Sequence, residues 1–207
     1  MDLNVFPTKN NLIAAKNSLQ LSLHGFELMD KKRNVLIQAL MELIDQAKEI
    51  QSEIDVTFKE AYSALERANI EMGIYNVEQL SLMIPEENSV RIKTRSVMGT
   101  EIPRVAYEKT QEIPYYSFYS TTPALDKAYV CFVKVKELTI RLSMIENSAY
   151  RLATSIKKTQ KRANALKNIT IPKYQERIAF ITNALEERER EDFIRLKVIK
   201  NKSMENI

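Results

Sequence analysis

The sequence predicts an all-α dominated fold: a long antiparallel two-helix coiled-coil hairpin, with a small β-hairpin and short elements at its fold-back end. Two observations predict it. The first and last thirds of the chain carry apolar residues on seven-residue spacing for far longer than an ordinary globular helix, and the middle is rich in proline and tyrosine. A long helix with a narrow apolar stripe needs a partner to cover that stripe, and the other helix of the same chain is the nearest one.

The first long helix is predicted over residues 1–72. Two neighbouring rows of its surface follow heptad spacing, one from Leu12 and one from Ala15, and Arg33 is the single charged member of the first row. Gly25 lies inside this helix, where glycine costs about 1 kcal/mol relative to alanine, so it reflects either close packing against a neighbour or a tolerated surface position. The seam residues expected from this helix are Leu12, Leu19, Phe26, Met29, Leu36, Leu40, Leu43, Ile50 and Ile54.

The central module is predicted over residues 73–122. Alternation of apolar and polar residues over 89–97 predicts a strand, 98–100 a turn, and 101–105 a return strand in which Pro103 suits an edge. The β-hairpin is thus expected near 89–105, after a turn at 85–88. Its key residues are Arg95, Val97, Met98 and Gly99.

An aromatic segment at residues 113–119 lacks helical spacing, so packing must order it. Packing of its tyrosines into the core and exposure of them as a patch that docks a partner are both open. With the hairpin, this segment forms a capping module at the fold-back end.

The second long helix is predicted over residues 123–200, with Thr122 as N-cap and Pro123 at the first helical position. Pro172 removes a backbone donor, so we expect a kink between Ile169 and Tyr174, beyond which the apolar rows restart out of step. Residues 201–207 are expected to form a frayed tail. The seam residues expected here are Leu138, Leu142, Ile145, Leu152, Ile156 and Leu166.

The residue inventory argues against catalysis. The chain has one cysteine, Cys131, on the apolar seam, and one histidine, His24. We find no glycine-rich phosphate-binding loop, no pair of nucleophile and histidine and no acidic cluster suited to magnesium, so no catalytic residue, cofactor or metal is expected. No run of eighteen apolar residues and no signal-peptide pattern is present, which predicts a cytosolic protein that does not insert into a membrane.

The charge balance is mildly basic. The net charge is +4 and the pI about 9.0, with basic clusters at residues 31–33 and 157–162. Acidic residues are interspersed through much of the rest and no aromatic platform on strands is evident, so we expect no nucleic-acid partner. Contact with an acidic protein surface, or solvation of a helix face, explains the clusters better.

Six ordered segments carry a family resemblance, at residues 7–9, 28–36, 95–99, 162–166, 171–172 and 189–197. Each is weak alone, but their joint order is specific. Together they resemble the D subunit of the V-type/A-type rotary ATPases, the central-stalk shaft, over nearly the whole length. Two departures concern fine contacts only: Phe6 stands where asparagine is expected from the family, and Lys167 where an acidic residue is common.

The resemblance implies a non-catalytic rotor shaft of a V-type ATPase or ATP synthase, peripheral to the membrane, which transmits torque in ATP synthesis or hydrolysis and ion transport. It implies three partners: a ring of A and B subunits around the chain ends, the F subunit, and a funnel-shaped subunit on the membrane rotor ring. Whether protons or sodium ions are transported stays open, as do the working direction and the handedness of the helix pair. The residues that the resemblance places inside the ring are Lys31, Lys32, Arg33, Arg162, Asn164, Arg190, Phe193 and Arg195.

Two other classes of protein compete with this interpretation. A cytosolic coiled-coil scaffold or holdase needs a surface for self-association, and a curved membrane-binding dimer needs one basic helix face. The scattered acidic residues Glu42, Asp45, Glu49 and Glu53 disfavour the membrane-binding dimer.

Overall fold

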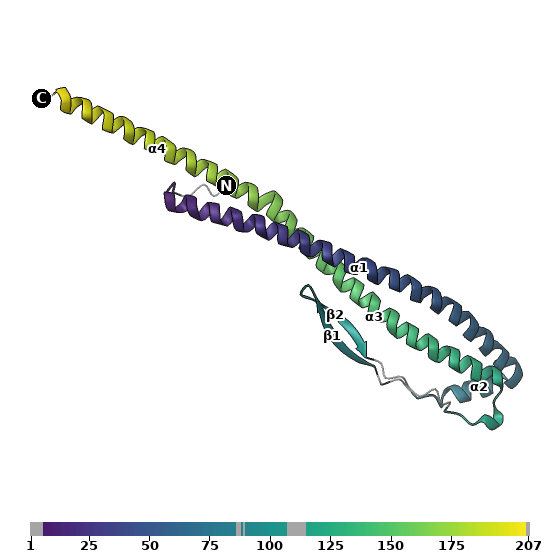
Figure 1. Ribbon diagram of the computed structural model, residues 1–207. Helices are drawn as coiled ribbons and strands as arrows, with labels where there is room; N and C mark the ends of the chain where they lie inside the picture. Colours follow the sequence, from purple (N-terminus) through teal and green to yellow (C-terminus); the bar gives the residue numbers. More distant parts are fainter. Residues whose placement is uncertain (1–5, 86–87, 89, 107–114, 206–207) are drawn as a thin grey trace. The chain divides into compact units, whose positions relative to one another are not determined.

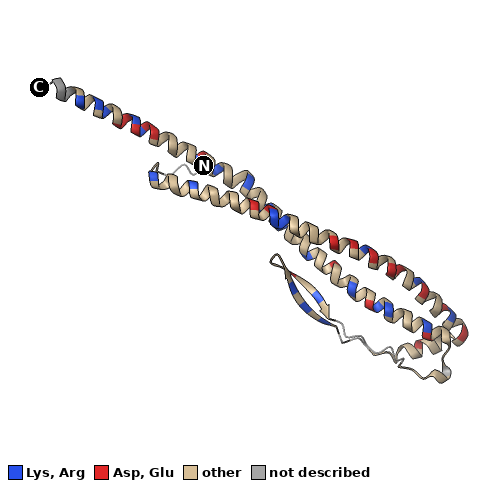
Figure 2. Cartoon of the chain, viewed as in Figure 1, with Lys and Arg blue, Asp and Glu red and all other residues tan. Residues whose placement is uncertain are grey.

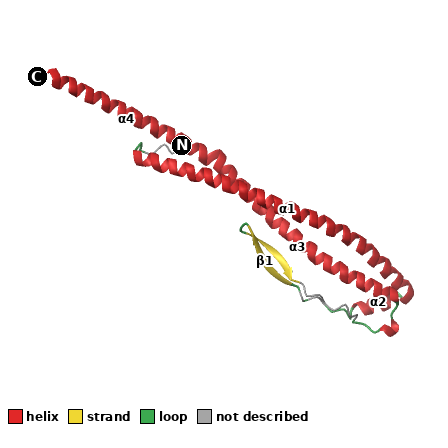
Figure 3. Ribbon diagram, in the orientation of Figure 1, coloured by secondary structure: helices red, strands yellow, loops and turns green. Residues whose placement is uncertain are grey.

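The computed structural model describes residues 6–85, 88, 90–106 and 115–205, and it is dominated by helices (Figures 1 and 3). The predicted fold class is confirmed: long helices from both ends of the chain pair antiparallel, and a small hairpin lies between them in sequence. In chain order the elements are α1 (Lys9–Met72), α2 (Ile74–Ser81), β1 (Arg91–Val97), β2 (Thr100–Ala106), the 3-10 turn η1 (Phe118–Ser120), α3 (Pro123–Ala165), the π-helical turn η2 (Leu166–Thr170) and α4 (Ile171–Glu205).

The chain divides into two units. One comprises residues 1–34 and 157–207, and the other comprises residues 35–156. Helices α1 and α3 both contribute to both units, and α4 lies in the first one.

In the unit of residues 35–156, α1 pairs antiparallel with α3. The Glu53 carboxylate lies 3.2 Å from the Lys134 ammonium, and the Tyr62 ring meets the Phe132 ring edge to face at 5.6 Å between centroids. Ala68, near the end of α1, packs with Leu125, near the start of α3. Residues later in α1 therefore contact residues earlier in α3, as in an antiparallel pair.

The unit of residues 1–34 and 157–207 shows the same antiparallel order. Arg33 donates to Gln160 at 2.8 Å, the Lys167 ammonium lies 5.9 Å from the centroid of the Phe26 ring, and Lys9 pairs with Glu189 at 3.2 Å.

Heptad spacing selects the buried side chains. Near the end of α1 they follow one another at intervals of three and four residues, which places them on one face of the helix. The small side chains among them let two helices approach closely. These residues are Ile54, Thr57, Ala61, Ala64 and Ala68, and the buried set of α3 includes Ala128, Val135, Leu138, Ile145, Ser148 and Leu152.

Pro172 follows a π-helical turn. The five residues Leu166–Thr170 are π-helical, with the Ile171 amide donating to the carbonyl of Leu166. This turn contains one more residue than an α-turn, so the buried and half-buried positions restart one step late, at Ile171, Tyr174, Ile178 and Ile181. The rows restart out of step as the sequence predicts, and the irregular turn lies just ahead of the proline. Helix α4 continues to Glu205, through most of the expected tail.

The fold-back end contains two features that differ from expectation. Gly73, at φ 82°, separates α1 from the short helix α2, which the weak periodicity of this stretch does not predict. Helix α3 does begin at Pro123, but within the described residues the buried Thr122 hydroxyl has no hydrogen-bond partner. The Thr122 carbonyl instead accepts from the amide of Leu125 at 3.0 Å, so the expected side-chain cap does not form. The turn expected at 85–88 lies partly outside the described residues.

The β-hairpin has the predicted position and a two-residue turn. β1 and β2 pair antiparallel from Arg91 opposite Ala106 to Val97 opposite Thr100. Met98 and Gly99 make the turn with φ of 48° and 73°, and two positive φ angles match the right-handed twist of the strands. Only Gly99 adopts this conformation without steric cost.

Candidate functional site

The predicted seam residues all lie at buried or half-buried positions. Five of them are buried and the other ten are half-buried, because a two-helix pair covers only one side of each helix. Gly25 is half-buried as well, but a methyl group there would meet the nearest atom, Cδ1 of Leu166, at 3.7 Å. This is an ordinary van der Waals distance, so packing does not require glycine at this position. The five buried seam residues are Leu36, Ile54, Leu138, Ile145 and Leu152.

Arg33 is the charged member of the heptad row that starts at Leu12, and its side chain reaches from α1 to α3. Its guanidinium donates to the Gln160 side-chain oxygen at 2.8 Å and pairs with Asp30 one turn earlier at 2.6 Å. The Gln160 amide in turn donates to the Asn164 side-chain oxygen at 2.8 Å. A chain of polar contacts thus runs from Asp30 to Asn164, where the row would otherwise carry an apolar residue. A network of this kind fixes the register of two helices more strictly than apolar contact does.

Of the eight residues that the family resemblance places inside a ring, the structure brings together Arg33 and Asn164, through Gln160. Lys32 is half-buried, and Lys31 and Arg162 are exposed. The other three lie on α4. Arg190 lies 3.8 Å from Glu186 and Arg195 lies 3.7 Å from Glu191, while the Phe193 side chain is 69% exposed.

The last part of α4 exposes large apolar side chains to solvent. The side chains of residues 186–201 are all exposed. Near its start this stretch contacts the first residues of the chain, where Arg188 donates to the carbonyl of Pro7 at 3.2 Å. An exposed apolar surface of this extent on a helix marks a surface for a partner. The apolar residues concerned are Phe193, Ile194, Leu196, Val198 and Ile199.

The aromatic segment has one buried and one fully exposed tyrosine, so core packing is observed and docking of a partner stays a prediction. Tyr116 is buried against Ala68 and Leu125, and its hydroxyl donates to Asp126 at 2.8 Å. Burial and then this hydrogen bond raise the pKa of Tyr116 above its ordinary value. Tyr119, in contrast, is fully exposed. Residues 113 and 114 lie outside the described residues.

Helix α3 holds the hairpin in place. Ser148 and Arg151 donate to backbone oxygens of β2, at Pro103 and Glu101, over 3.4 and 3.3 Å. Thr100 bonds to Ser155 at 2.8 Å. Of the predicted hairpin residues, Val97 is half-buried, whereas Arg95, Met98 and Gly99 are exposed.

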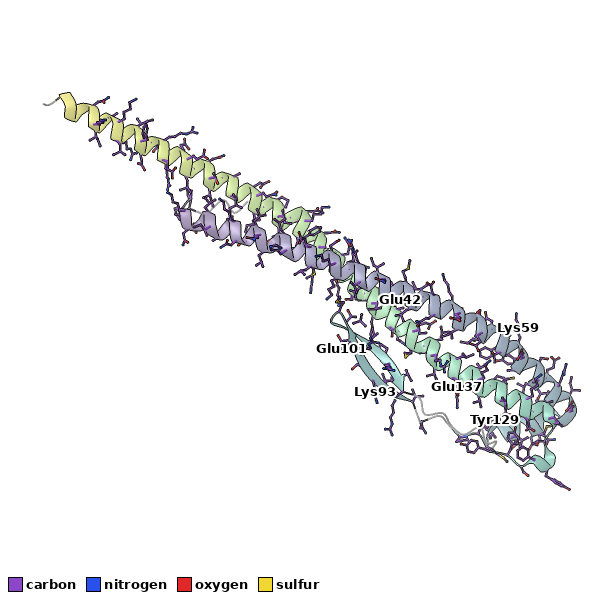
Figure 4. All side chains as sticks on the ribbon, viewed as in Figure 1. Glu42, Lys59, Lys93, Glu101, Tyr129 and Glu137 are labelled. Carbon is purple, nitrogen blue, oxygen red and sulfur yellow. The ribbon has the colours of Figure 1, made fainter. Side chains whose placement is uncertain are left out.

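The second half of α1 has an acidic surface, which the sequence alone indicated only as an argument against a membrane-binding face. Residues 35–72 contain eight acidic and three basic side chains. Figure 2 shows the acidic residues along this stretch, and Figure 4 labels Glu42 there. Glu42, Asp45 and Glu49 are exposed, so this surface suits a basic partner.

Two other kinds of site are absent from the described residues. None of their helices is long and apolar enough to cross a membrane. Nor do three or more histidine, cysteine, aspartate or glutamate side chains gather among them in a way that could hold a metal ion.

Comparison with known proteins gives a consistent result. Residues 11–201 match the family described as the ATP synthase D subunit. The chain is 47% identical to the D subunit of the V-type ATP synthase of Thermotoga neapolitana, over 97% of this chain and 98% of that protein. It is 35% identical to the D subunit of the A-type ATP synthase of Thermococcus sibiricus and 34% identical to that of Pyrococcus furiosus, in both cases over 96% of this chain and 94% of the relative.

Proposed function

Since the chain belongs to the family of ATP synthase D subunits, we propose that it is the central rotor shaft of a V/A-type ATPase or ATP synthase. In this role it has no catalytic residue. It transmits torque between an ATP-hydrolysing or ATP-synthesising ring of A and B subunits and an ion-translocating membrane ring. It works on the cytoplasmic side as a peripheral part of the complex.

The observation that carries the proposal is the exposed end of α4. A helix that presents Phe193, Ile194 and Leu196 to water would gain stability if a surrounding protein covered it. The bore of a ring of subunits would supply that cover. Together with the family match over residues 11–201, this supports placing the paired chain ends, with Lys31, Lys32 and Arg162, inside the ring.

Helix pairing supplies the stiffness that torque needs. The two chain ends are held together by the Arg33 network and by Lys9 with Glu189. A rotating shaft acts on the ring by presenting different side chains to each catalytic pair, which biases their open and closed states. Two regions are the proposed contacts for the F subunit and for the funnel-shaped subunit: the hairpin, which packs on α3 between Ser148 and Ser155, and the fold-back end with its exposed Tyr119.

Reconstitution of the A/B ring with and without this chain tests the proposal. The isolated chain should hydrolyse no ATP, and a bead attached to it should rotate in one direction when the reconstituted ring hydrolyses ATP. The double variant F193A/I194A should reduce binding to the ring, whereas the control E186A/E187A on the same helix should change it little. Stable self-association without binding to the ring would refute the shaft and favour the coiled-coil scaffold or holdase.

A further inference from the structure

The two outer edges of the β-hairpin differ in what covers them. In an antiparallel pair, backbone groups point alternately toward and away from the partner strand. On β2 the residues that contact α3 through the backbone are Glu101, Pro103 and Val105, which alternate along the strand. The outer edge of β2 is therefore covered, and Pro103 has no outward donor to leave unpaired.

The outer edge of β1 is open. By the register, the residues opposite Glu101, Pro103 and Val105 are Ser96, Thr94 and Ile92, so their amides and carbonyls point away from β2. Within the described part of the chain, no further strand pairs with β1. The first six residues of the strand are exposed, and the strand contains no proline. Such an edge is a ready template for another strand.

One face of this hairpin concentrates positive charge. Arg91, Lys93 and Arg95 alternate along β1 and share a face, and Arg104 of β2 stands directly opposite Lys93. Figure 2 shows basic residues on both strands, and Figure 4 labels Lys93. All four side chains are exposed. Two like charges directly opposite each other destabilise a strand pair. Glu101, the single acidic side chain of the two strands, pairs with Ser96 and so lies on the other face.

We propose that β1 is a docking edge, to which an extended acidic segment of another protein of the same complex adds as a third strand. Backbone hydrogen bonds to Ile92, Thr94 and Ser96 give affinity, and carboxylates beside Arg91, Lys93 and Arg95 of the neighbouring strand give specificity. A lysine alone would suffice to guard the edge against aggregation, whereas four cations on one face match a segment of opposite charge. The inference rests on the proposed function only in placing the chain within that complex.

Residue-resolved hydrogen exchange of the isolated chain and of the assembled complex tests the pairing. The amides of Ile92, Thr94 and Ser96 should exchange fast in the isolated chain and at least about tenfold more slowly in the complex. The amides of Lys93 and Arg95, which face β2, provide the internal control because they are protected in both states. The variant T94P, which removes one outward donor and no bond to β2, should abolish the new protection.

Zero-length carbodiimide crosslinking tests the acidic partner. Lys93 is the only amine on the two strands, so a crosslink from it in the complex should identify a peptide with carboxylates on alternate residues. The control variant K93R keeps the charge and should lose this crosslink. A crosslink to a second copy of this chain would overturn the proposal.

Unchanged exchange at Ile92, Thr94 and Ser96 in a complex that assembles and rotates would overturn this inference and leave the proposed function intact. Protection of these amides in an assembly in which the chain does not bind the A/B ring even when A and B subunits are supplied would support the docking edge and count against the shaft.

Discussion

The variant G25A should stabilise the protein by about 1 kcal/mol. Glycine in a helix interior costs about that much relative to alanine, because it loses more backbone freedom on folding. The space for a methyl group exists, since the nearest atom, Cδ1 of Leu166, would lie 3.7 Å from the new carbon. The methyl group would therefore add an apolar contact across the helix pair and displace nothing.

Thermal unfolding of the isolated chain, followed by circular dichroism at the helix minimum, measures the effect. For a chain of this size about 1 kcal/mol corresponds to a rise of about 2–4 °C in Tm. The matched control is G73A, at φ 82° and ψ 143°, a conformation that alanine adopts only with strain of about 1–3 kcal/mol. Its Tm should fall although the site is open. A lower Tm for G25A would show that the helices approach more closely at Gly25 than the structure gives, and would refute the reasoning.

Three further predictions concern individual side-chain contacts. Y116F should lower the free energy of unfolding by about 1–2 kcal/mol in urea titrations, because it removes the bond to Asp126. Because folding raises the pKa of Tyr116, the wild-type chain should lose stability as the pH rises above about 10, the unfolded value, and Y116F should lose less; equal losses would contradict this. In a double-mutant cycle, R33A and Q160A should show a coupling of about 0.5–1.5 kcal/mol, and strict additivity would mean that their 2.8 Å contact contributes nothing. With Cys131 replaced by serine, the pair L40C and L152C should form an intrachain disulfide faster than L40C and L166C, because the antiparallel order set by Tyr62 with Phe132 places Leu40 opposite about residue 154, to about a turn. Equal rates would refute that register.

The long helices and the hairpin could be predicted because each repeats a simple period. Apolar spacing of three and four residues marks a helix face over many turns, and alternation around Met98 and Gly99 marks two strands and their turn. These signals are local, so one sequence suffices to detect them.

The features that escaped prediction are not fixed by residue type alone. Nothing near Arg33 indicates that Gln160 will accept its hydrogen bond, because that contact depends on the register of two helices. Similarly, Pro172 predicts a disturbed helix, but the sequence does not indicate that the turn before it contains one extra residue. Thr122 has the residue type of an N-cap, yet its buried hydroxyl has no partner among the described residues.

The π-helical turn changes the direction in which the later side chains of α4 point around the helix axis. An α-helix advances about 100° per residue, so the one additional residue in Leu166–Thr170 turns every later side chain of α4 by about that angle relative to the end of α3. Phe193 and Leu196 therefore point in directions that an uninterrupted helix would not give them. Deleting one residue from this turn would restore an uninterrupted helix and move the apolar end of α4 by roughly a quarter of a revolution. In a shaft that turns inside a ring, that change would alter the timing of contact rather than its strength.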